Sequence, residues 1–462
     1  MPQLNKPLST ANKVDSDRLF AGIWLRSSAI TPGERFVCAN IICIPIWWVL
    51  GLFEYLPFLL LAMVGVYEVY RYGKFRLKRP LLPVIALLTF GMYQLGRLLV
   101  LRVVYYQYGT ITISDILILS FCPAFWLWYI QSNKIKIRLE VVAWACTISV
   151  LQIIAFWVLL QFVIPESVFW PPRLRTVSGI LTGRGVGEAN KNYYLLPFLA
   201  RTLVEDVNRF SFFFIFPEFF AVFVGFISLV ALELKKYWQS LLLLIACAFL
   251  LFLSATRMVW VALPLVIVLR YLFVALTKRW GPKVVILLVA IASFITFSLP
   301  PATEAIFGKI TGSIEAVNSV RADSSEVRFE IYRQTWLGIL DNPFWGYMSK
   351  GEAISATSSS SIGSHSALLG SLLYRTGFIG TLMFAVFWVS LFLWLYATSA
   401  DRPLIAFTMM SFYTLVSPTL ALVYDMPISS LLLLLSIAIG QKIEGKGEKV
   451  KQLKAKTNFR YL

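Results

Sequence analysis

The chain has 462 residues, of which 58% are hydrophobic and 14% are charged, and its mean hydropathy is +0.73. A water-soluble domain of this length cannot bury so many apolar side chains, so the composition excludes a soluble globular protein and predicts an all-α polytopic membrane protein. The net charge of +18 then indicates membrane topology and attraction to anionic lipid, and nucleic-acid binding is not expected.

The first 35 residues mix basic, acidic and small polar side chains and lack the layout of a cleaved signal peptide, so residues 1–35 are expected to form a cytoplasmic tail. Beyond this tail, about 12 segments are apolar enough to cross the hydrocarbon layer, which takes about 20 helical residues. Helices 1–5 are expected over residues 36–163, helices 6–9 over 212–299 and helices 10–12 over 377–441. The individual spans are placed near 36–53, 55–70, 81–100, 114–130, 139–163, 212–232, 238–254, 258–276, 284–299, 377–397, 403–421 and 428–441.

Basic residues set the predicted orientation. Lysine and arginine follow the second, fourth, sixth, eighth and tenth spans, and residues 442–462 form a basic tail. Because cytoplasmic loops carry the excess of these residues, both termini are expected in the cytoplasm. The segments 164–211 and 300–376 then lie outside, and their length indicates function or structure of their own.

The sequence gives no support for a metal or a nucleotide cofactor. It contains no nucleotide-binding glycine loop, dinucleotide fingerprint or Asp-rich metal motif. The cysteines all fall in expected spans, without a CxxC pair or a nearby histidine, and are interpreted as small apolar residues. They are Cys38, Cys43, Cys122, Cys146 and Cys247. No cofactor is therefore expected.

The second external segment predicts an amphipathic helix over residues 327–340, ended by Asp341-Asn-Pro343. One face of this helix collects residues at helical spacing, and residues 353–364 after it are rich in Ser and Thr, which is typical of a mobile flap. The face consists of Arg328, Ile331, Tyr332, Thr335, Trp336 and Ile339.

His365 is the only histidine of the chain, and it lies where this Ser-rich loop enters a membrane helix. A lone histidine is usually a hydrogen-bonded polar residue without a chemical role. Imidazole is, however, the side chain that accepts and returns a proton near neutral pH. The position favours His365 as a general base.

Three arginines are expected at the outer face, where positive charge is less common. Arg209 precedes a span, Arg257 lies in a short outer turn, and Arg328 heads the amphipathic helix. Guanidinium groups pair bidentately with phosphate, so three of them around one cavity would hold a diphosphate without a metal. Arginine at a helix end also extends to lipid head groups, and this alternative stays open for each of them.

Further substrate-binding candidates lie around these residues. Arg175, in the first external segment, competes with Arg209 for the same role, and Arg97 is a charge late in the third span. Arg333 adds a cation to the amphipathic helix. Trp345 and Tyr347 are placed to stack against sugar rings, or they belong to the aromatic belt of the membrane interface.

These motifs together resemble the O-antigen ligase and O-antigen polymerase superfamily, the membrane glycosyltransferases of bacterial surface polysaccharide assembly. The resemblance covers roughly residues 205–400. It rests on Arg209-Phe-Ser211 ahead of Pro217, on Ser254-Ala-Thr-Arg257 before a span, on the helix from Arg328 to Asn342-Pro-Phe-Trp-Gly346, and on His365 with Leu368, Leu372, Gly377 and Gly380. Two positions depart from the family's pattern: Ser366 stands where Asn is common, and Phe212 stands where glycine is common.

The resemblance implies a bacterial inner-membrane enzyme whose active site faces the periplasm. Its donor would be a glycan linked to undecaprenyl diphosphate, its acceptor a sugar or lipid-anchored glycan hydroxyl, and its transfer inverting and metal-independent. Ligase and polymerase share the motifs and are not separated by them. A secondary transporter would also explain twelve spans, although the two halves of the chain show no internal symmetry, and a structural subunit of an export assembly is the third alternative.

Overall fold

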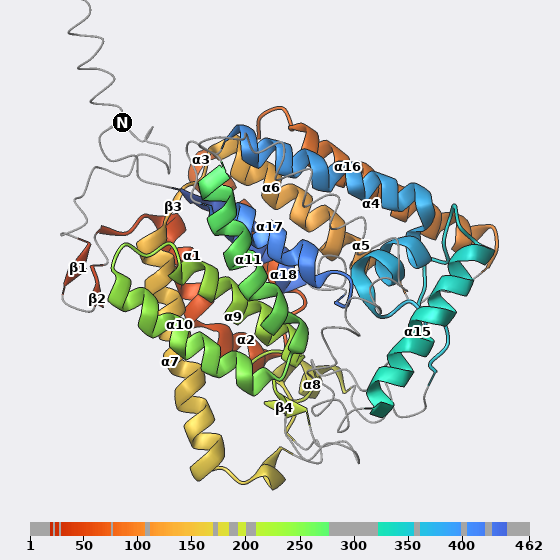
Figure 1. The fold of residues 1–462 in the computed structure, drawn as a ribbon. Coiled ribbons are helices and arrows are strands. Elements are labelled where there is room, and N and C mark those ends of the chain that lie inside the picture. Colours follow the sequence, from red (N-terminus) through yellow and green to blue (C-terminus); the bar gives the residue numbers. More distant parts are fainter. Residues whose placement is uncertain are drawn as a thin grey trace, which may run out of the picture.

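The computed structural model describes residues 19–21, 24–26, 29–74, 77–106, 111–169, 174–183, 193–199, 209–276, 322–354, 361–398, 404–420 and 427–440. These residues are mostly helical (Figure 1). With its long apolar helices, the chain is an integral membrane protein.

In this part of the chain, five helices are long and apolar enough to cross a membrane, and all five agree with expected spans. They are α4 (Leu82–Val103), the continuous run Ile113–Asn133 made of α5, η3 and α6, α7 (Leu139–Phe162), α10 (Tyr237–Ser254), and the run Ser366–Ala397 made of η6 and α16. Within these runs, the bounds are Ile113–Ile116 for α5, Leu117–Phe121 for η3, Cys122–Asn133 for α6, Ser366–Tyr374 for η6 and Arg375–Ala397 for α16.

The expected number of about twelve spans is not reached by the described helices. Three further apolar helices, α9 (Pro217–Ala231), α17 (Ile405–Val416) and α18 (Pro427–Ala438), are too short by length alone, as is α3 (Leu56–Tyr72). The helix α11 (Arg257–Leu276) lies where the eighth span was expected. The span expected near 284–299 and the basic tail 442–462 lie outside the described residues.

Two of the discrepancies come from proline. The span expected over 36–53 is two helices, α1 (Pro32–Ile42) and α2 (Ile44–Leu50), which meet at 60°. Pro45, in the first turn of α2, has no N–H with which to continue the hydrogen bonding of α1. Likewise, Pro217 starts α9 five residues after the expected boundary, because Phe216 before it is extended.

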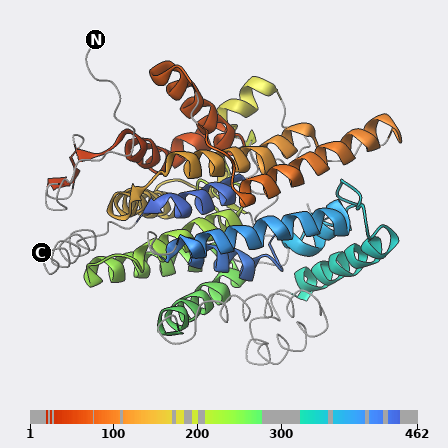
Figure 2. The same cartoon turned by 90° about the horizontal axis from the view of Figure 1, so that it is seen from above.

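The helix α9 forms the centre of the bundle. Nearly all its side chains are buried, and it packs against α7, α10, α11, α17 and α18 (Figures 1 and 2). A helix that is apolar all round is stable only when it is covered on every side. The rings of Phe212, Phe214 and Phe220 pack at its N-terminal end, with centroid distances of 4.9 and 5.8 Å to Phe220.

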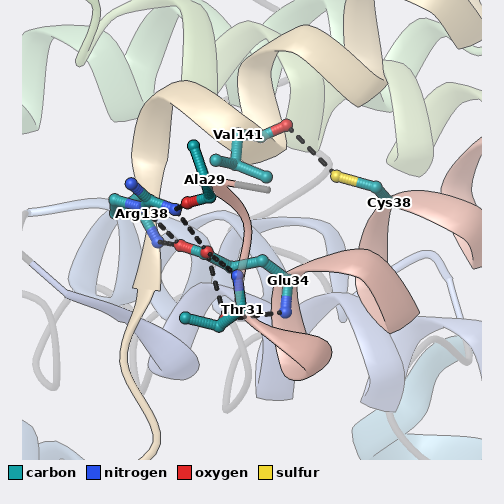
Figure 3. Close-up of polar contacts among 6 residues, drawn as sticks. All are labelled: Ala29, Thr31, Glu34, Cys38, Arg138 and Val141. Carbon is teal, nitrogen blue, oxygen red and sulfur yellow. Dashed lines mark hydrogen bonds and ion pairs between the residues drawn. The ribbon is translucent and has the colours of Figure 1, made fainter. Parts of the chain in front are cut away.

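One end of the bundle is held by an ion pair between distant segments. Glu34, in the first turn of α1, accepts hydrogen bonds of 2.7 Å from both Nε and Nη2 of Arg138, which lies in β3 (Ile137–Arg138) (Figure 3). Strand β3 pairs in parallel with β6 (Ile439–Gly440). Arg138 was interpreted as a topology signal, but its side chain also binds α1 to the start of α7.

The opposite end carries elements of the segment 164–211, which was expected to be external. Here lie η4 (Glu166–Val168), α8 (Val177–Thr182), and an antiparallel pair made by β4 (Phe198–Leu199) and β5 (Arg209–Phe210). A second antiparallel pair, β1 (Phe20–Ala21) and β2 (Trp24–Leu25), precedes α1. Arg209 was expected just ahead of a span, and it lies in β5, before α9 begins at Pro217.

The amphipathic helix expected over 327–340 is α15 (Ala322–Asp341), which packs against η6 at the edge of the bundle (Figure 1). Ile331, Thr335 and Ile339 are buried at intervals of four residues, as the pattern predicted. Trp336 was expected on the same face, but it is 44% exposed. The face of α15 that packs is therefore narrower than the sequence pattern.

Candidate active site

His365 lies at the turn that leads into η6. It is the last extended residue before this π-helix, and its Nδ1 is 2.8 Å from Ser364 Oγ. The next residue, Ser366, is buried with φ of +67° and accepts a hydrogen bond from Leu369 N with its hydroxyl. The chain thus reverses direction sharply behind the imidazole, which fixes where the ring can point.

The loop that carries His365 is clamped two residues earlier, at Gly363. Its N–H donates to Thr335 Oγ1 of α15 at 2.9 Å, and its carbonyl oxygen accepts from Arg375 Nη2 at 3.0 Å. Thr335 and Arg375 are 1% and 2% exposed. Both peptide groups of this glycine are therefore held by buried side chains from two different helices.

A second loop supports the same junction. Tyr347 N and Met348 N donate to the carbonyl oxygens of Tyr374 and Arg375 at 3.0 and 2.8 Å. Gly377 has φ of +66° and lies so close to this loop that a Cβ would come within 2.3 Å of Phe344 O. A glycine is therefore required where the membrane helix α16 bends against the loop.

The electrostatic surroundings of His365 are cationic. Burial lowers the pKa of His365 to about 4, Arg328 and Lys350 act in the same direction, and Glu218 opposes them. With such a pKa, the imidazole is neutral at pH 7 in the ligand-free protein.

Glu218 interacts with Arg209, with Arg328 and with His365. Its carboxylate forms an ion pair of 2.8 Å with Arg209 Nη2, and it also interacts electrostatically with Arg328. Among the described residues, Arg209 Nε is buried without a hydrogen-bond partner.

Arg257 follows the turn between α10 and α11, which lies next to Pro217 and Glu218. Thr256 Oγ1, on the residue before it, donates to Pro217 O at 3.4 Å, and Pro217 precedes Glu218. The structure thus brings His365, Arg328, Arg209 and the turn of Arg257 to one end of the bundle. Sequence reasoning missed Lys350, for which the pattern gave no signal, and Arg375, whose charge in an apolar run was a signal.

The remaining candidates lie elsewhere. Arg333 is exposed and ion-paired with Glu330 at 2.7 Å. The guanidinium of Arg97 lies 5.2 Å from the Trp345 ring, and Tyr347 stacks on Tyr374 at 4.8 Å. The contacts of Trp345 and Tyr347 hold their loop against α4 and η6. None of the four candidates Arg333, Arg97, Trp345 and Tyr347 interacts with His365 in a contact the structure describes.

Arg175 and Arg209 pair with different parts of the segment 193–199. Arg175 bridges to Tyr194, while Arg209 pairs with Leu199. Arg209 forms an ion pair with Glu218, which interacts electrostatically with His365. The structure describes no such contact for Arg175.

The two departures from the resembled family coincide with unusual backbone. Ser366 has φ of +67° and Phe212 has φ of +47°, so both lie in the left-handed region. Glycine and asparagine adopt this conformation most readily, which explains why they are common at these two positions. The conformation persists here because Phe212 is fully buried in the aromatic cluster and Ser366 is held by hydrogen bonds.

Among the described residues, no group of three or more His, Cys, Asp and Glu side chains is arranged to hold a metal ion. The chemistry available at this end of the bundle is a neutral imidazole near the guanidinium group of Arg328 and the ammonium group of Lys350. This arrangement is suited to accepting a proton from one group while an anion forms nearby.

Comparison with protein families finds that residues 241–385 match the O-antigen ligase family. The matched region includes Arg257, Arg328, the Gly363 clamp and His365, and it ends within α16. None of the curated proteins compared with the chain matches it.

Proposed function

Since this chain carries the O-antigen ligase domain over residues 241–385, we propose that it is a membrane glycosyltransferase of surface polysaccharide assembly. The donor is a glycan linked to undecaprenyl diphosphate, and the acceptor is a hydroxyl of a sugar or of a lipid-anchored glycan. The observation that carries the proposal is the position of the only histidine, which is neutral and next to Arg328 and Lys350.

His365 is the base of this reaction. In the proposed tautomer, Nδ1–H donates to Ser364 Oγ, so that Nε2 accepts the proton of the acceptor hydroxyl. The hydroxyl oxygen forms a bond to the anomeric carbon of the donor, and the bond from this carbon to the diphosphate oxygen breaks. A direct displacement of this kind inverts the anomeric configuration.

The arginines stabilise the leaving diphosphate. Arg328 and Lys350 lie near the imidazole, Arg209 forms an ion pair with Glu218, and Arg257 begins the helix α11. Preorganised cations near a developing anion lower the barrier without any rearrangement during the reaction. Bound diphosphate also offsets the cationic surroundings of His365, so the pKa of the imidazole should rise towards the value of an effective base.

The topology proposed with this function places the site in the periplasm. Residues 1–35 and 442–462 are cytoplasmic tails, the segments 164–211 and 300–376 are external, and the helices between them lie in the inner membrane. The alternation of basic residues supports this orientation, and the ion pair at Arg138 lies at the end of α7 that is away from His365.

Substitution of His365 tests the proposal. His365→Ala should leave a protein that inserts and binds the lipid-linked donor, but turnover should fall by about 10²–10⁴, the range for a positioned acid–base group. His365→Gln keeps a hydrogen-bonding side chain that cannot take up a proton. If His365→Gln turns over like the unsubstituted protein, the residue only orients the acceptor. If purified His365→Ala is fully active, the glycosyltransferase mechanism is wrong.

A further inference from the structure

A cavity of about 530 Å³ lies at the end of the bundle opposite His365. Its walls come from α1, α3, α6, β3 and α18. Pockets for small molecules occupy about 300–1,000 Å³, so the cavity has the volume of a ligand site. No step of the proposed transfer reaction takes place at this end.

The inner part of the cavity is apolar. It is lined by Ile41, Ile44, Leu56, Leu60, Val64 and Leu432, together with neighbouring side chains of α18. These residues belong to helices that face the hydrocarbon region, since the outer surface of α3 exposes Phe58, Met63 and Val66. A hydrocarbon chain is the occupant that matches such walls in a membrane.

Another part of the cavity is polar. Lys134, Lys136 and Asn133 line it at the C-terminal end of α6, and Tyr67 and Tyr72 line it from α3. The Arg71 guanidinium lies 5.8 and 5.9 Å from the centroids of these two tyrosine rings. Tyrosine with arginine at a helix end is typical of the membrane interface.

The charges of the lining leave one carboxylate without a cation. Glu34 is satisfied by Arg138, as Figure 3 shows. Glu68 is 2% exposed, and its contact among the described residues is a hydrogen bond of 3.0 Å from Tyr129 Oη. A buried carboxylate is stable only when it is paired or well hydrogen-bonded. An occupant that brings a cation would complete the surroundings of Glu68.

The lysines and this carboxylate line the same cavity. Tyr129, which bonds Glu68, lies in α6, and Lys134 and Lys136 follow the end of this helix. The cavity thus offers cations for a phosphate, a carboxylate for an amine, and apolar walls for a chain.

We propose that this cavity binds one aminophospholipid of the inner leaflet, of the phosphatidylethanolamine type. Its phosphate lies against Lys134 and Lys136, its ammonium donates to Glu68, and an acyl chain occupies the apolar part between α1, α3 and α18. An anionic lipid without an amine satisfies the lysines but leaves Glu68 without a cation. The bound lipid joins α3 to the rest of the bundle.

Lipid binding to the purified full-length protein tests this site. The protein is delipidated in detergent and titrated with phosphatidylethanolamine, phosphatidylglycerol or phosphatidylcholine, and the retained lipid and the Tm are measured. We expect phosphatidylethanolamine to bind most tightly and to raise the Tm most. Equal effects of the three lipids, or a preference for phosphatidylglycerol, would overturn the proposal.

Three variants locate the site. Glu68→Gln should weaken phosphatidylethanolamine binding by about tenfold or more, since one charge-assisted hydrogen bond is lost, and should leave phosphatidylglycerol binding unchanged. Val64→Trp should weaken both by filling the apolar part. Lys78→Gln is the matched control, an exposed lysine of the same end that does not line the cavity. If Glu68→Gln and Val64→Trp both bind phosphatidylethanolamine as the control does, the lipid binds elsewhere.

Discussion

Replacement of Thr335 by valine tests whether the clamp on Gly363 positions His365. Valine has nearly the shape of threonine but lacks the hydroxyl, so the packing of α15 against η6 is kept. The Thr335 hydroxyl accepts from Gly363 N at 2.9 Å and donates to Ile331 O at 2.6 Å. In the variant, the buried Gly363 N–H loses its partner, while the bond from Arg375 to the carbonyl of Gly363 remains.

The magnitude follows from the burial of both groups. An unsatisfied buried donor costs roughly 1–3 kcal/mol, which corresponds to a factor of about 5 to 150 in an equilibrium or rate. If the loop shifts to find another partner for the N–H, His365 leaves its position, and kcat should fall by this factor. The KM for the lipid-linked donor should change little, because the arginines are untouched.

The assay is transfer by purified protein from a lipid-diphosphate-linked glycan, with the Tm recorded for each variant. Thr335→Ser restores the hydroxyl and should restore kcat. Thr147→Val is the matched control, since the Thr147 hydroxyl bonds only Ala143 O within its own helix. If Thr335→Val lowers the Tm but keeps the kcat of the control, the clamp stabilises the fold without positioning His365, and the reasoning is refuted.

Four further outcomes are expected. Arg→Lys at 209, 257 or 328 should each lower transfer by about 10²–10³, since an ammonium cannot reproduce the guanidinium fork; a defect in Arg175→Lys but not in Arg209→Lys would transfer the role to Arg175. The kcat/KM should fall as the pH drops through the pKa of His365, near pH 4 in the free enzyme, because the imidazolium cannot accept a proton. The kcat should begin to fall at a higher pH, because bound diphosphate raises the pKa of His365. The residual activity of His365→Ala should show neither decrease. Glu34→Gln should destabilise the protein by roughly 3 kcal/mol by leaving Arg138 without its counter-charge, measured as a lower Tm, whereas Glu330→Gln in the exposed pair with Arg333 should leave the Tm unchanged. Cysteine labelling should place residues 356–364 outside and residues 442–456 inside, and labelling of both from one side would reject the topology.

Much of the candidate site was visible in the sequence because its chemistry depends on rare residue types. A single histidine and arginines at expected outer turns are identified without knowing the fold. The residues that pair with them cannot be identified from the sequence alone. The pairing of Glu218 with Arg209 depends on the strand β5, which the hydropathy pattern did not predict.

The sequence by itself determined the class of the protein, the position of five long apolar helices, the amphipathic helix before His365 and the resemblance to the O-antigen ligases. Each of these depends on composition or on spacing within one segment, which local physics governs. Only the tertiary structure decided the clamp on Gly363 and the pairing of Glu34 with Arg138, which are 104 residues apart. These features depend on which buried polar groups meet, and a buried charge or N–H finds its partner only when distant segments pack together.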